Sequence, residues 1–458
     1  MSTTEVVSLQ GKPPGWPGIS WIEGRTLLQI PNVKGQAEWR VGPGNKNDSP
    51  VFHNVAMANN RTRSVLLLGL AIRNKWLLNK GKLRILDGLA ASSLRSRRWL
   101  NEIPPALAEL LDIISVDRDE ESISWALANH EKHPPNNSNS EQLSIQKGDL
   151  RQIVYSGGWQ WIDIDPYGSP IPFLDSAMQN LARRAILQVS ATDTAALCGT
   201  YPQVTRRRYA AYAVNDSVTH DTAMRILLGN IALCAARHER SIEPLISVFD
   251  GHHTRVSVLV TPGKKNASNV YNNLGWRVNE PDKKTISAAI KAGLHNLGCA
   301  NIPQPRVFLP YNSPPESLAN GKVSGPLWIG PLAREDVLEQ LTEEYALEIC
   351  GISKEKDENI ISLTGWNDED IEKSNRGVVR SIKKLYESKD AVGIKGLVTM
   401  DELPQWTDIG GPPSPKKLVS KLKERGFKAS ISVISTPAIQ TNAPWNELIE
   451  IVKNLAKQ

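Results

Sequence analysis

The stretch WIDIDPYGSP, residues 161–170, indicates the fold class of the chain. Its first half is a mainly apolar, strand-like run, and its second half breaks into proline, glycine and proline, which are turn residues. Asp165 therefore stands where a strand ends, directly before Pro166 and the ring of Tyr167. The same sequence is also compatible with an ordinary turn. The residues at the ends of the other predicted strands therefore decide whether Asp165 belongs to a functional site.

Further apolar runs between residues 83 and 262 are predicted strands. Five runs alternate with helical patterns, as in a parallel sheet covered by helices: LRILD (83–87), DIISVD (112–117), LSIQKGD (143–149), WIDID (161–165) and AILQVS (185–190). Two more, LISVFD (245–250) and RVSVLVTP (255–262), are separated by only GHHT, so they must pair antiparallel. This order predicts an α/β fold, the Rossmann-like sheet of class I methyltransferases, which closes with an antiparallel hairpin.

The length of 458 residues predicts two domains of unequal size. We expect a flexible leader at residues 1–18, the methyltransferase domain at 19–265 and a smaller α+β domain at 266–458, with the boundary in the polar stretch 261–275. In the second domain, a basic amphipathic helix over 414–426 runs into a strand. That pattern resembles a winged-helix unit and suits either a nucleic-acid backbone or a packing face.

The net charge and the cysteine spacing indicate which partners and which structural frameworks the protein can have. With 54 Lys and Arg against 48 Asp and Glu, the net charge is +6, a mild surplus that suits a polyanionic partner. The widely spaced cysteines, Cys198, Cys234, Cys299 and Cys350, exclude a CxxC zinc knuckle and argue against a disulfide framework. Neither a signal peptide nor a membrane span is indicated, so we expect a cytoplasmic protein.

Aspartates end four of the predicted strands: Asp87, Asp117, Asp149 and Asp165. In an open parallel sheet, residues at the carboxyl ends of successive strands share one crevice. A single aspartate there is often only a cap or a turn residue, but four on consecutive strands point to a ligand site. The segment DGLAASSLR after the first strand lacks GxGxxG, which favours an adenosyl cofactor without a pyrophosphate.

The strand-end residues suit the parts of such a cofactor. Asp117 is placed to accept both ribose hydroxyls, and Arg118 beside it to cover the adenine. Asp149 is placed to accept from the adenine amine, while Leu150 offers a backbone N–H. A carboxylate-rich crevice that includes Asp87 also suits the fixed positive charge of a sulfonium.

Asp165, Pro166 and Tyr167 are the predicted catalytic residues. An amine conjugated to a base ring is a poor nucleophile, because its lone pair is delocalised into the ring. Hydrogen bonds from its two N–H groups to the Asp165 carboxylate and the Pro166 carbonyl would align the nitrogen with the cofactor methyl. Tyr167 would stack on the base, or alternatively be a core aromatic beside Phe173.

Several segments in order resemble one family, the archaeal-type tRNA (guanine-26-N2)-dimethyltransferases: VFHNVAMANNR (51–61), DGLAASSLRSRR (87–98), DIDPYGSP (163–170), ATDTAALCGTYP (191–202), GPLWIGPL (325–332) and STPAIQTNAPW (435–445). The resemblance implies that Arg61, Arg95, Asp117, Asp149 and Leu150 contact S-adenosylmethionine and that Asp165 is the catalytic acidic residue. It also implies a tRNA substrate, with ATDTAALCGTYP and the arginines 206–208 on the tRNA side.

The chain departs from the family pattern at His53-Asn54-Val55 and at Ser92-Ser93-Leu94-Arg95, so the loop after the first strand is expected to be shaped differently. Some relatives carry a four-cysteine zinc knuckle before the GPLW segment, where this chain has only Cys299, so we expect no metal. Two other functions are weighed: an amino-methyltransferase acting on DNA adenine or a protein amide, and an inactive tRNA-binding protein. The single proline in Asp165-Pro166-Tyr167 disfavours the former, and the intact cofactor residues disfavour the latter.

Overall fold

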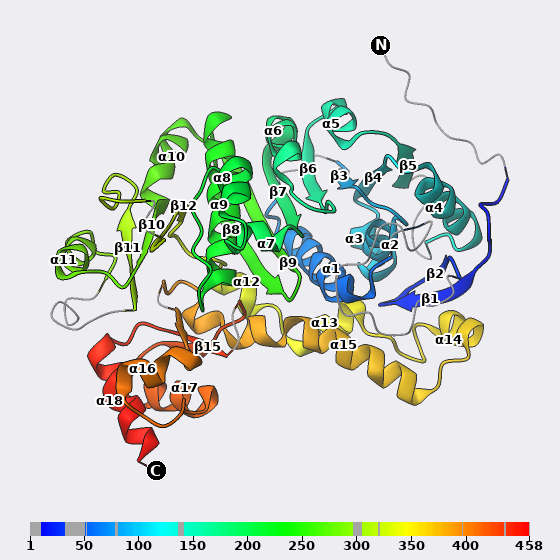
Figure 1. Cartoon of the computed structure of the whole chain (residues 1–458). Helices are drawn as coiled ribbons and strands as arrows, with labels where there is room; N and C mark the ends of the chain where they lie inside the picture. The colour runs from blue at the N-terminus through cyan, green and yellow to red at the C-terminus, as the bar shows by residue number, and fades with distance from the viewer. Residues whose placement is uncertain are drawn as a thin grey trace. The chain divides into compact units, whose positions relative to one another are not determined.

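The computed structural model describes residues 11–32, 51, 53–77, 81–135, 142–295, 305–318, 321–395, 397–434 and 437–457. The chain forms two compact units that interleave along the sequence (Figure 1). Unit 1 consists of Met1–Pro166, Pro172–Ser190 and Gln340–Lys383, and unit 2 of Tyr167–Ile171, Ala191–Glu339 and Lys384–Gln458.

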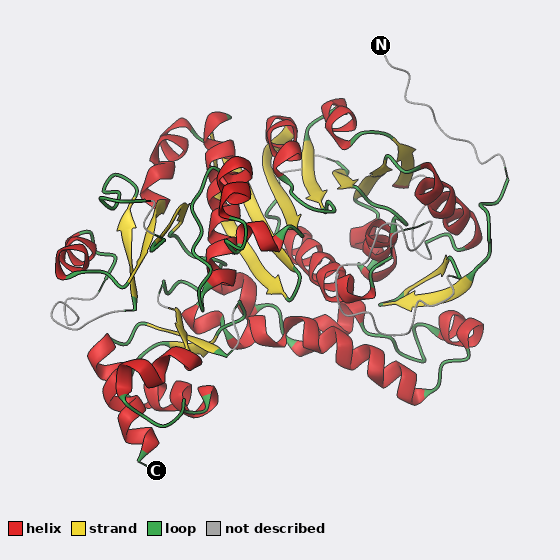
Figure 2. Cartoon of the chain, in the orientation of Figure 1, coloured by secondary structure: helices red, strands yellow, loops and turns green. Residues whose placement is uncertain are grey.

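Unit 1 alternates strands and helices, as Figure 2 shows by colour. Its strands are β1 (Ile19–Glu23), β2 (Thr26–Ile30), β3 (Leu83–Gly88), β4 (Leu111–Asp117), β5 (Leu143–Lys147), β6 (Trp159–Ile164) and β7 (Leu181–Ala191, whose last residue falls in unit 2). Its helices are η2 (Val55–Met57), α1 (Ala58–Arg73), α2 (Leu94–Glu102), α3 (Pro105–Ala108), α4 (Glu120–Lys132), α5 (Leu150–Ile153), η4 (Val154–Ser156), α6 (Ile171–Asn180), α13 (Glu343–Cys350), α14 (Glu358–Thr364) and α15 (Asp368–Glu387).

The large sheet of unit 1 has the strand order β5-β4-β3-β6-β7. All four neighbouring pairs are parallel, as predicted from the alternation of strands and helices. Its β-branched and aromatic side chains are buried, among them Ile85, Ile113, Trp161 and Ile186, each 0% exposed. Burial on both faces is what a parallel sheet flanked by helices requires. The five predicted parallel strands are therefore confirmed.

The segment 340–383, which the sequence suggests belongs to the second domain, packs within unit 1. The hydroxyl of Tyr345 on α13 donates a hydrogen bond of 3.0 Å to the Leu66 carbonyl of α1. A Cβ at Gly69 would lie 2.6 Å from that hydroxyl, so a glycine on α1 permits this approach. Arg73 lies over the Tyr345 ring at 4.9 Å. The two helices are thus joined through one buried tyrosine.

Unit 2 contains an antiparallel hairpin and two small sheets. Its strands are β8 (Arg240–Asp250), β9 (His253–Pro262), β10 (Leu274–Asn279), β11 (Arg306–Pro310), β12 (Val323–Trp328), β13 (Leu397–Thr399), β14 (Ala429–Ile431) and β15 (Ala438–Thr441). Its helices are α7 (Thr194–Leu197), α8 (Pro202–Tyr209), α9 (Thr219–Arg237), α10 (Lys264–Ser268), η5 (Asn269–Asn273), α11 (Lys283–Lys291), α12 (Glu335–Glu339), η7 (Lys389–Ala391), η8 (Met400–Glu402), α16 (Leu403–Thr407), α17 (Pro415–Glu424) and α18 (Trp445–Ala456).

The hairpin β8-β9 is antiparallel, as its short connection predicts. The small sheets have the orders β11-β10-β12 and β13-β15-β14, and both are antiparallel. Helices α16, α17 and α18 lie with β15 in the orange and red part of Figure 1, around a core that includes Leu418, Ile439 and Leu448. The basic helix and the strand predicted near residues 414–434 are α17 and β14.

The predicted domains, 19–265 and 266–458, stay a prediction. Of the predicted leader, residues 1–10 lie outside the described residues, while the ring of Trp16 lies 5.3 Å from that of Trp125 on α4. In the described ranges, no helix is both long enough and apolar enough to cross a lipid bilayer.

Candidate active site

The pairing register of the sheet brings carboxylates together at the ends of β3 and β6. Asp87 is the register partner of Asp163, and Gly88 that of Ile164, so Asp165 follows directly beyond the paired residues. Side chains of paired residues in neighbouring strands lie on the same face of a sheet. Asp87 and Asp163 are therefore neighbours, although the sequence analysis did not select Asp163.

Arg95 on α2 binds three carboxylates with one guanidinium. Its Nη2 pairs with Oδ2 of Asp165, its Nη1 lies 3.2 Å from Oδ2 of Asp163, and its Nε lies 3.7 Å from Oδ1 of Asp87. The Arg95 side chain is 7% exposed, so these charges interact with little solvent screening. We call Arg95, Asp87, Asp163 and Asp165 the acidic cluster.

Burial and neighbouring charges shift the pKa of two members of the acidic cluster, Asp87 and Arg95. Burial raises the pKa of Asp87 to about 7; Arg95 opposes this shift and Asp163 adds to it. The Ser96 hydroxyl donates a hydrogen bond of 2.7 Å to Asp87. For Arg95, burial is outweighed by its three carboxylates, and the pKa lies above the ordinary value.

Asn60 on α1 is a further member of this site that the sequence analysis missed. Its Oδ1 accepts a hydrogen bond of 2.9 Å from Nη1 of Arg95, and its side chain is buried. Asn60 lies in the segment VFHNVAMANNR, whose resemblance to the family pattern could have identified this residue. A buried asparagine in an apolar helix needs a polar partner, which Arg95 supplies.

The loop after β3 has an unusual backbone. Leu89, Ala91 and Ser93 have φ values of 62°, 45° and 56°, a left-handed conformation that non-glycine residues seldom adopt. Asp117 at the end of β4 holds this loop, because its Oδ2 accepts a hydrogen bond of 2.8 Å from the Ala91 N–H. Strained loops of this kind concentrate at ligand sites. This is the loop that was expected to differ in shape from that of the family, because the chain departs from the family pattern at Ser92-Ser93-Leu94-Arg95.

Close approach at the start of this loop depends on Gly88. A Cβ there would lie 2.6 Å from Leu150 Cδ2 and 3.0 Å from the Asp163 carbonyl oxygen. Leu150 is 2% exposed and begins α5, directly after Asp149, whose side chain caps that helix. The predicted residue Leu150 therefore lies against the end of β3, and Asp149 directly precedes it in the chain.

The Asp149 carboxylate is bound by arginines. Arg151 donates to Oδ1 through Nε at 3.0 Å and to Oδ2 through Nη2 at 2.6 Å, and these bonds lower the pKa of Asp149. Nη1 of the exposed Arg118 lies 3.7 Å from Oδ2 of Asp149. The predicted pair Arg118 and Asp149 is therefore brought together, with Arg151 as an added partner.

Arg61, which is predicted to contact the cofactor, is bound by the carboxylate of Glu23. Its Nε and Nη2 donate hydrogen bonds of 2.6 and 2.5 Å to the two oxygens of Glu23 on β1, and Nη2 also donates to the Asn54 carbonyl. Glu23 lies 3.0 Å from Nη1 of Arg98 as well. In the part of the chain that the structure describes, Arg61 thus belongs to a buried network beside β1.

In unit 2, the turn that follows Pro166 is fixed by the ATDT segment. The Gly168 N–H donates a hydrogen bond of 2.6 Å to the Thr192 hydroxyl, and the Thr192 N–H donates one of 3.0 Å to the Gly168 carbonyl. Ser169 donates to the Tyr209 hydroxyl at 3.0 Å, which donates in turn to Asp193 at 2.6 Å. Tyr167 is 64% exposed, which contradicts the alternative of a core aromatic.

Known proteins with similar sequences share one name. A protein of Pyrococcus horikoshii named tRNA (guanine(26)-N(2))-dimethyltransferase is 27% identical over 424 residues, which cover 89% of this chain and 93% of that protein. A protein of Methanobrevibacter smithii with the same name is 28% identical over 441 residues, 95% of this chain and 97% of that one.

The solved structure of Trm1 from Pyrococcus horikoshii with S-adenosyl-L-methionine matches the fold, with a TM-score of 0.71 at 23% identity. It covers 95% of this chain and 100% of that chain, and it confirms the predicted fold class. The family model for N2,N2-dimethylguanosine tRNA methyltransferases matches residues 31–453. The chain belongs to the N2,N2-dimethylguanosine tRNA methyltransferase family.

Proposed function

We propose that this chain transfers one or two methyl groups from S-adenosylmethionine to the exocyclic N2 of guanine 26 in tRNA, in the cytoplasm. The observation that carries the proposal is the acidic cluster, in which a single arginine fixes Asp165 at the end of β6, directly before Pro166. The family membership and the names of the relatives support the substrate.

The residues beside the loop after β3 fit an adenosyl cofactor. Each oxygen of Asp117 accepts one backbone hydrogen bond, from Ala91 and from Asp119, and keeps a lone pair for a ribose hydroxyl. Gly88 leaves room for close approach, and the Leu150 N–H is offered at the start of α5. Asp149 and Arg118 would contact the adenine. The contact of Arg61 with the cofactor stays a prediction, since Glu23 binds its guanidinium.

The cofactor supplies the methyl group, and the chain supplies the alignment of the amine. Asp165 and the Pro166 carbonyl accept the two N–H groups of the guanine amine, which directs the nitrogen lone pair away from them. As the nitrogen gains positive charge, the Asp165 carboxylate stabilises that charge and takes up the proton. Arg95 holds Asp165 in place from the other side, and Tyr167 offers an exposed ring for stacking.

The test of the proposal is a transfer assay on unmodified tRNA. The protein is incubated with tRNA and methyl-labelled S-adenosylmethionine, and the tRNA is then digested to nucleosides. We expect the label in N2-methylguanosine and N2,N2-dimethylguanosine, and a tRNA with adenosine in place of guanosine 26 should remain unlabelled. Label in any other nucleoside, or label without dependence on residue 26, would contradict the proposal.

Substitution of Asp165 separates chemistry from cofactor binding. We expect Asp165→Ala to lower the transfer rate by about 10²-fold or more, in line with the loss of a general base, with cofactor affinity retained. Rates come from single-turnover labelling and affinity from calorimetry. The control is Asp401→Ala, which removes an exposed carboxylate of unit 2. Turnover of Asp165→Ala close to that of the control would refute the assigned role.

A further inference from the structure

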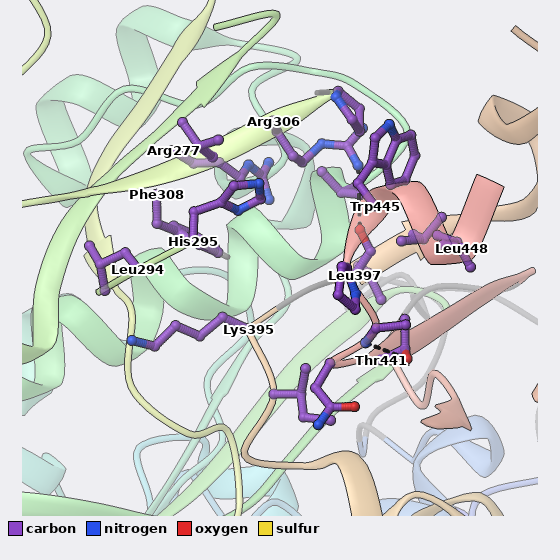
Figure 3. A pocket seen from close by; sticks show the side chains of 18 of the residues that line it. Arg277, Leu294, His295, Arg306, Phe308, Lys395, Leu397, Thr441, Trp445 and Leu448 are labelled. Atoms are coloured by element: carbon purple, nitrogen blue, oxygen red, sulfur yellow. Dashed lines mark hydrogen bonds between the residues drawn. The ribbon is translucent and has the colours of Figure 1, made fainter. Parts of the chain in front are cut away.

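A cavity of about 430 Å³ lies within unit 2, and residues of unit 2 line all of it. Figure 3 shows Arg277 and Arg306 extending from β10 and β11, Trp445 and Leu448 on α18, and Lys395 on the segment before β13. The volume falls in the range of about 300–1,000 Å³ that is usual for small-molecule sites.

The cavity is lined by more cationic than acidic side chains. Arg277, Arg306 and Lys395 line it, together with one carboxylate, Asp221. Arg277 is 1% exposed and lies 3.3 Å from Oδ2 of Asp221, while Arg306 pairs with Glu402. Asp221 is shared, because Nε of Arg225 lies 2.8 Å from the same oxygen.

Lys395 is the cation that this network does not neutralise. Among the described residues it forms no ion pair, and burial together with the charge of Arg225 lowers its pKa. A half-buried ammonium beside arginines is unfavourable without an anion.

Unpartnered polar atoms lie in the same wall. Nε of Arg277, Nε of Arg306 and Oδ1 of Asp221 are buried and have no hydrogen-bond partner in the described part of the chain. Buried polar groups in proteins are nearly always hydrogen-bonded. These atoms have almost no accessible surface, so Lys395, which forms no ion pair among the described residues, is the group of this wall that an anion would neutralise.

The rest of the lining is apolar and aromatic, with Leu294, Phe308, Leu397, Trp445 and Leu448. The cations suit a phosphate, and the aromatic wall suits a ring. We propose that this cavity binds a nucleotide, with its phosphate at Lys395, either as a free molecule or as one residue of a bound RNA. This site lies outside the acidic cluster and goes beyond the proposed methyl transfer.

Uridine 5′-monophosphate is the probe, because it shares neither the adenine of the cofactor nor the guanine of the substrate. Calorimetry of the full-length protein, saturated with S-adenosylhomocysteine, measures binding of the probe, of uridine and of inorganic phosphate. We expect a single binding site for uridine 5′-monophosphate. Uridine should bind at least about tenfold more weakly than this probe, because it lacks the phosphate and its charge-assisted contacts. Absence of binding at millimolar probe concentrations would overturn the proposal.

The test variant is Lys395→Met. Its control is Lys416→Ala, which removes an exposed lysine of the same unit. We expect Lys395→Met to weaken probe binding about tenfold and Lys416→Ala to leave it unchanged. Filter binding of unmodified tRNA distinguishes the sources: Lys395→Met weakens tRNA binding if the nucleotide belongs to RNA and leaves it unchanged if the ligand is free. Equal probe affinity in Lys395→Met and the wild type would refute the site.

Discussion

At the scale of single residues, Gly88 joins the sheet to the candidate cofactor site. A side chain there meets Leu150 and the backbone of Asp163, so Gly88→Ala must displace α5 or the end of β6. We expect a loss of about 1–3 kcal/mol in the free energy of unfolding, as for other overpacked sites, and weaker cofactor binding. Denaturant unfolding and calorimetry check both.

The control for this prediction is Gly81→Ala, because no atom of the described residues lies within 4 Å of a Cβ at Gly81. We expect that variant to bind the cofactor as the wild type does. If Gly88→Ala were as stable and as tight a binder as the control, the close approach of Leu150 would have no role.

The strand-end aspartates could be predicted singly, but their shared partner could not. Local pattern places Asp87 and Asp165 at strand ends, and pairing register then brings Asp163 beside Asp87. Register depends on contacts between distant segments, which no local pattern contains. The same holds for the ion pair of Glu23 with Arg61, which joins two segments far apart in the sequence.

At the scale of elements, the β1-β2 hairpin is tied to α1 and α2 through the carboxylate of Glu23. Burial alone would raise the pKa of Glu23, but the charge and hydrogen bonds of Arg61, with the charge of Arg98, lower it to about 2. The folded state therefore releases this proton more readily than the unfolded chain. Stability from Glu23 is present above about pH 4.5 and is lost as the pH falls toward 2.

We expect Glu23→Gln to be less stable than the wild type by about 3–5 kcal/mol at pH 7, because it leaves the buried Arg61 without its carboxylate and removes one of the two carboxylates at Arg98. The difference should shrink as the pH falls from 4.5 toward 2. Urea unfolding across that range gives the profile, and Glu109→Gln, an exposed position, is the control. A difference that stays constant with pH would contradict the role of the carboxylate.

Elements with a strong apolar pattern were predictable, and their bounds were less so. The predicted strand 185–190 is observed as Leu181–Ala191, because the first part of β7 contains the polar residues Arg183 and Arg184, which carry no strand signal. The segment 334–346 has a helical pattern in the sequence, and the structure forms two helices there, α12 and α13. Thr342 ends that pattern as the N-cap of α13, since its side chain accepts from the Tyr345 N–H.

At the scale of the whole molecule, unit 1 is completed by a segment from late in the chain. A chain that ends at Glu339 lacks α13 and leaves the surface of α1 around Gly69 uncovered. We expect faster hydrogen exchange in α1 (Ala58–Arg73) of that chain than in the full-length protein. The control is a chain that ends at Glu387, which retains α13 and α15 and should keep α1 protected. Equal protection in both truncated chains would contradict the prediction.

The packing of segment 340–383 in unit 1 could not be predicted from the sequence, for a physical reason. Amphipathic patterns show that a helix has an apolar face, but they do not identify the surface that the face covers. The pairing of Tyr345 with Gly69 depends on two positions far apart in the chain. Sequence order placed the segment in the second domain, and packing places it in the first unit.

The single guanidinium of Arg95 limits how this site can vary during evolution. Loss of Arg95 alone removes the guanidinium that the three carboxylates share, whereas loss of one carboxylate brings the cluster closer to neutrality. Substitutions at these positions are therefore strongly non-additive. A lineage can lose Arg95 only together with, or after, an aspartate such as Asp87 or Asp163, so the order of mutations is constrained by electrostatics.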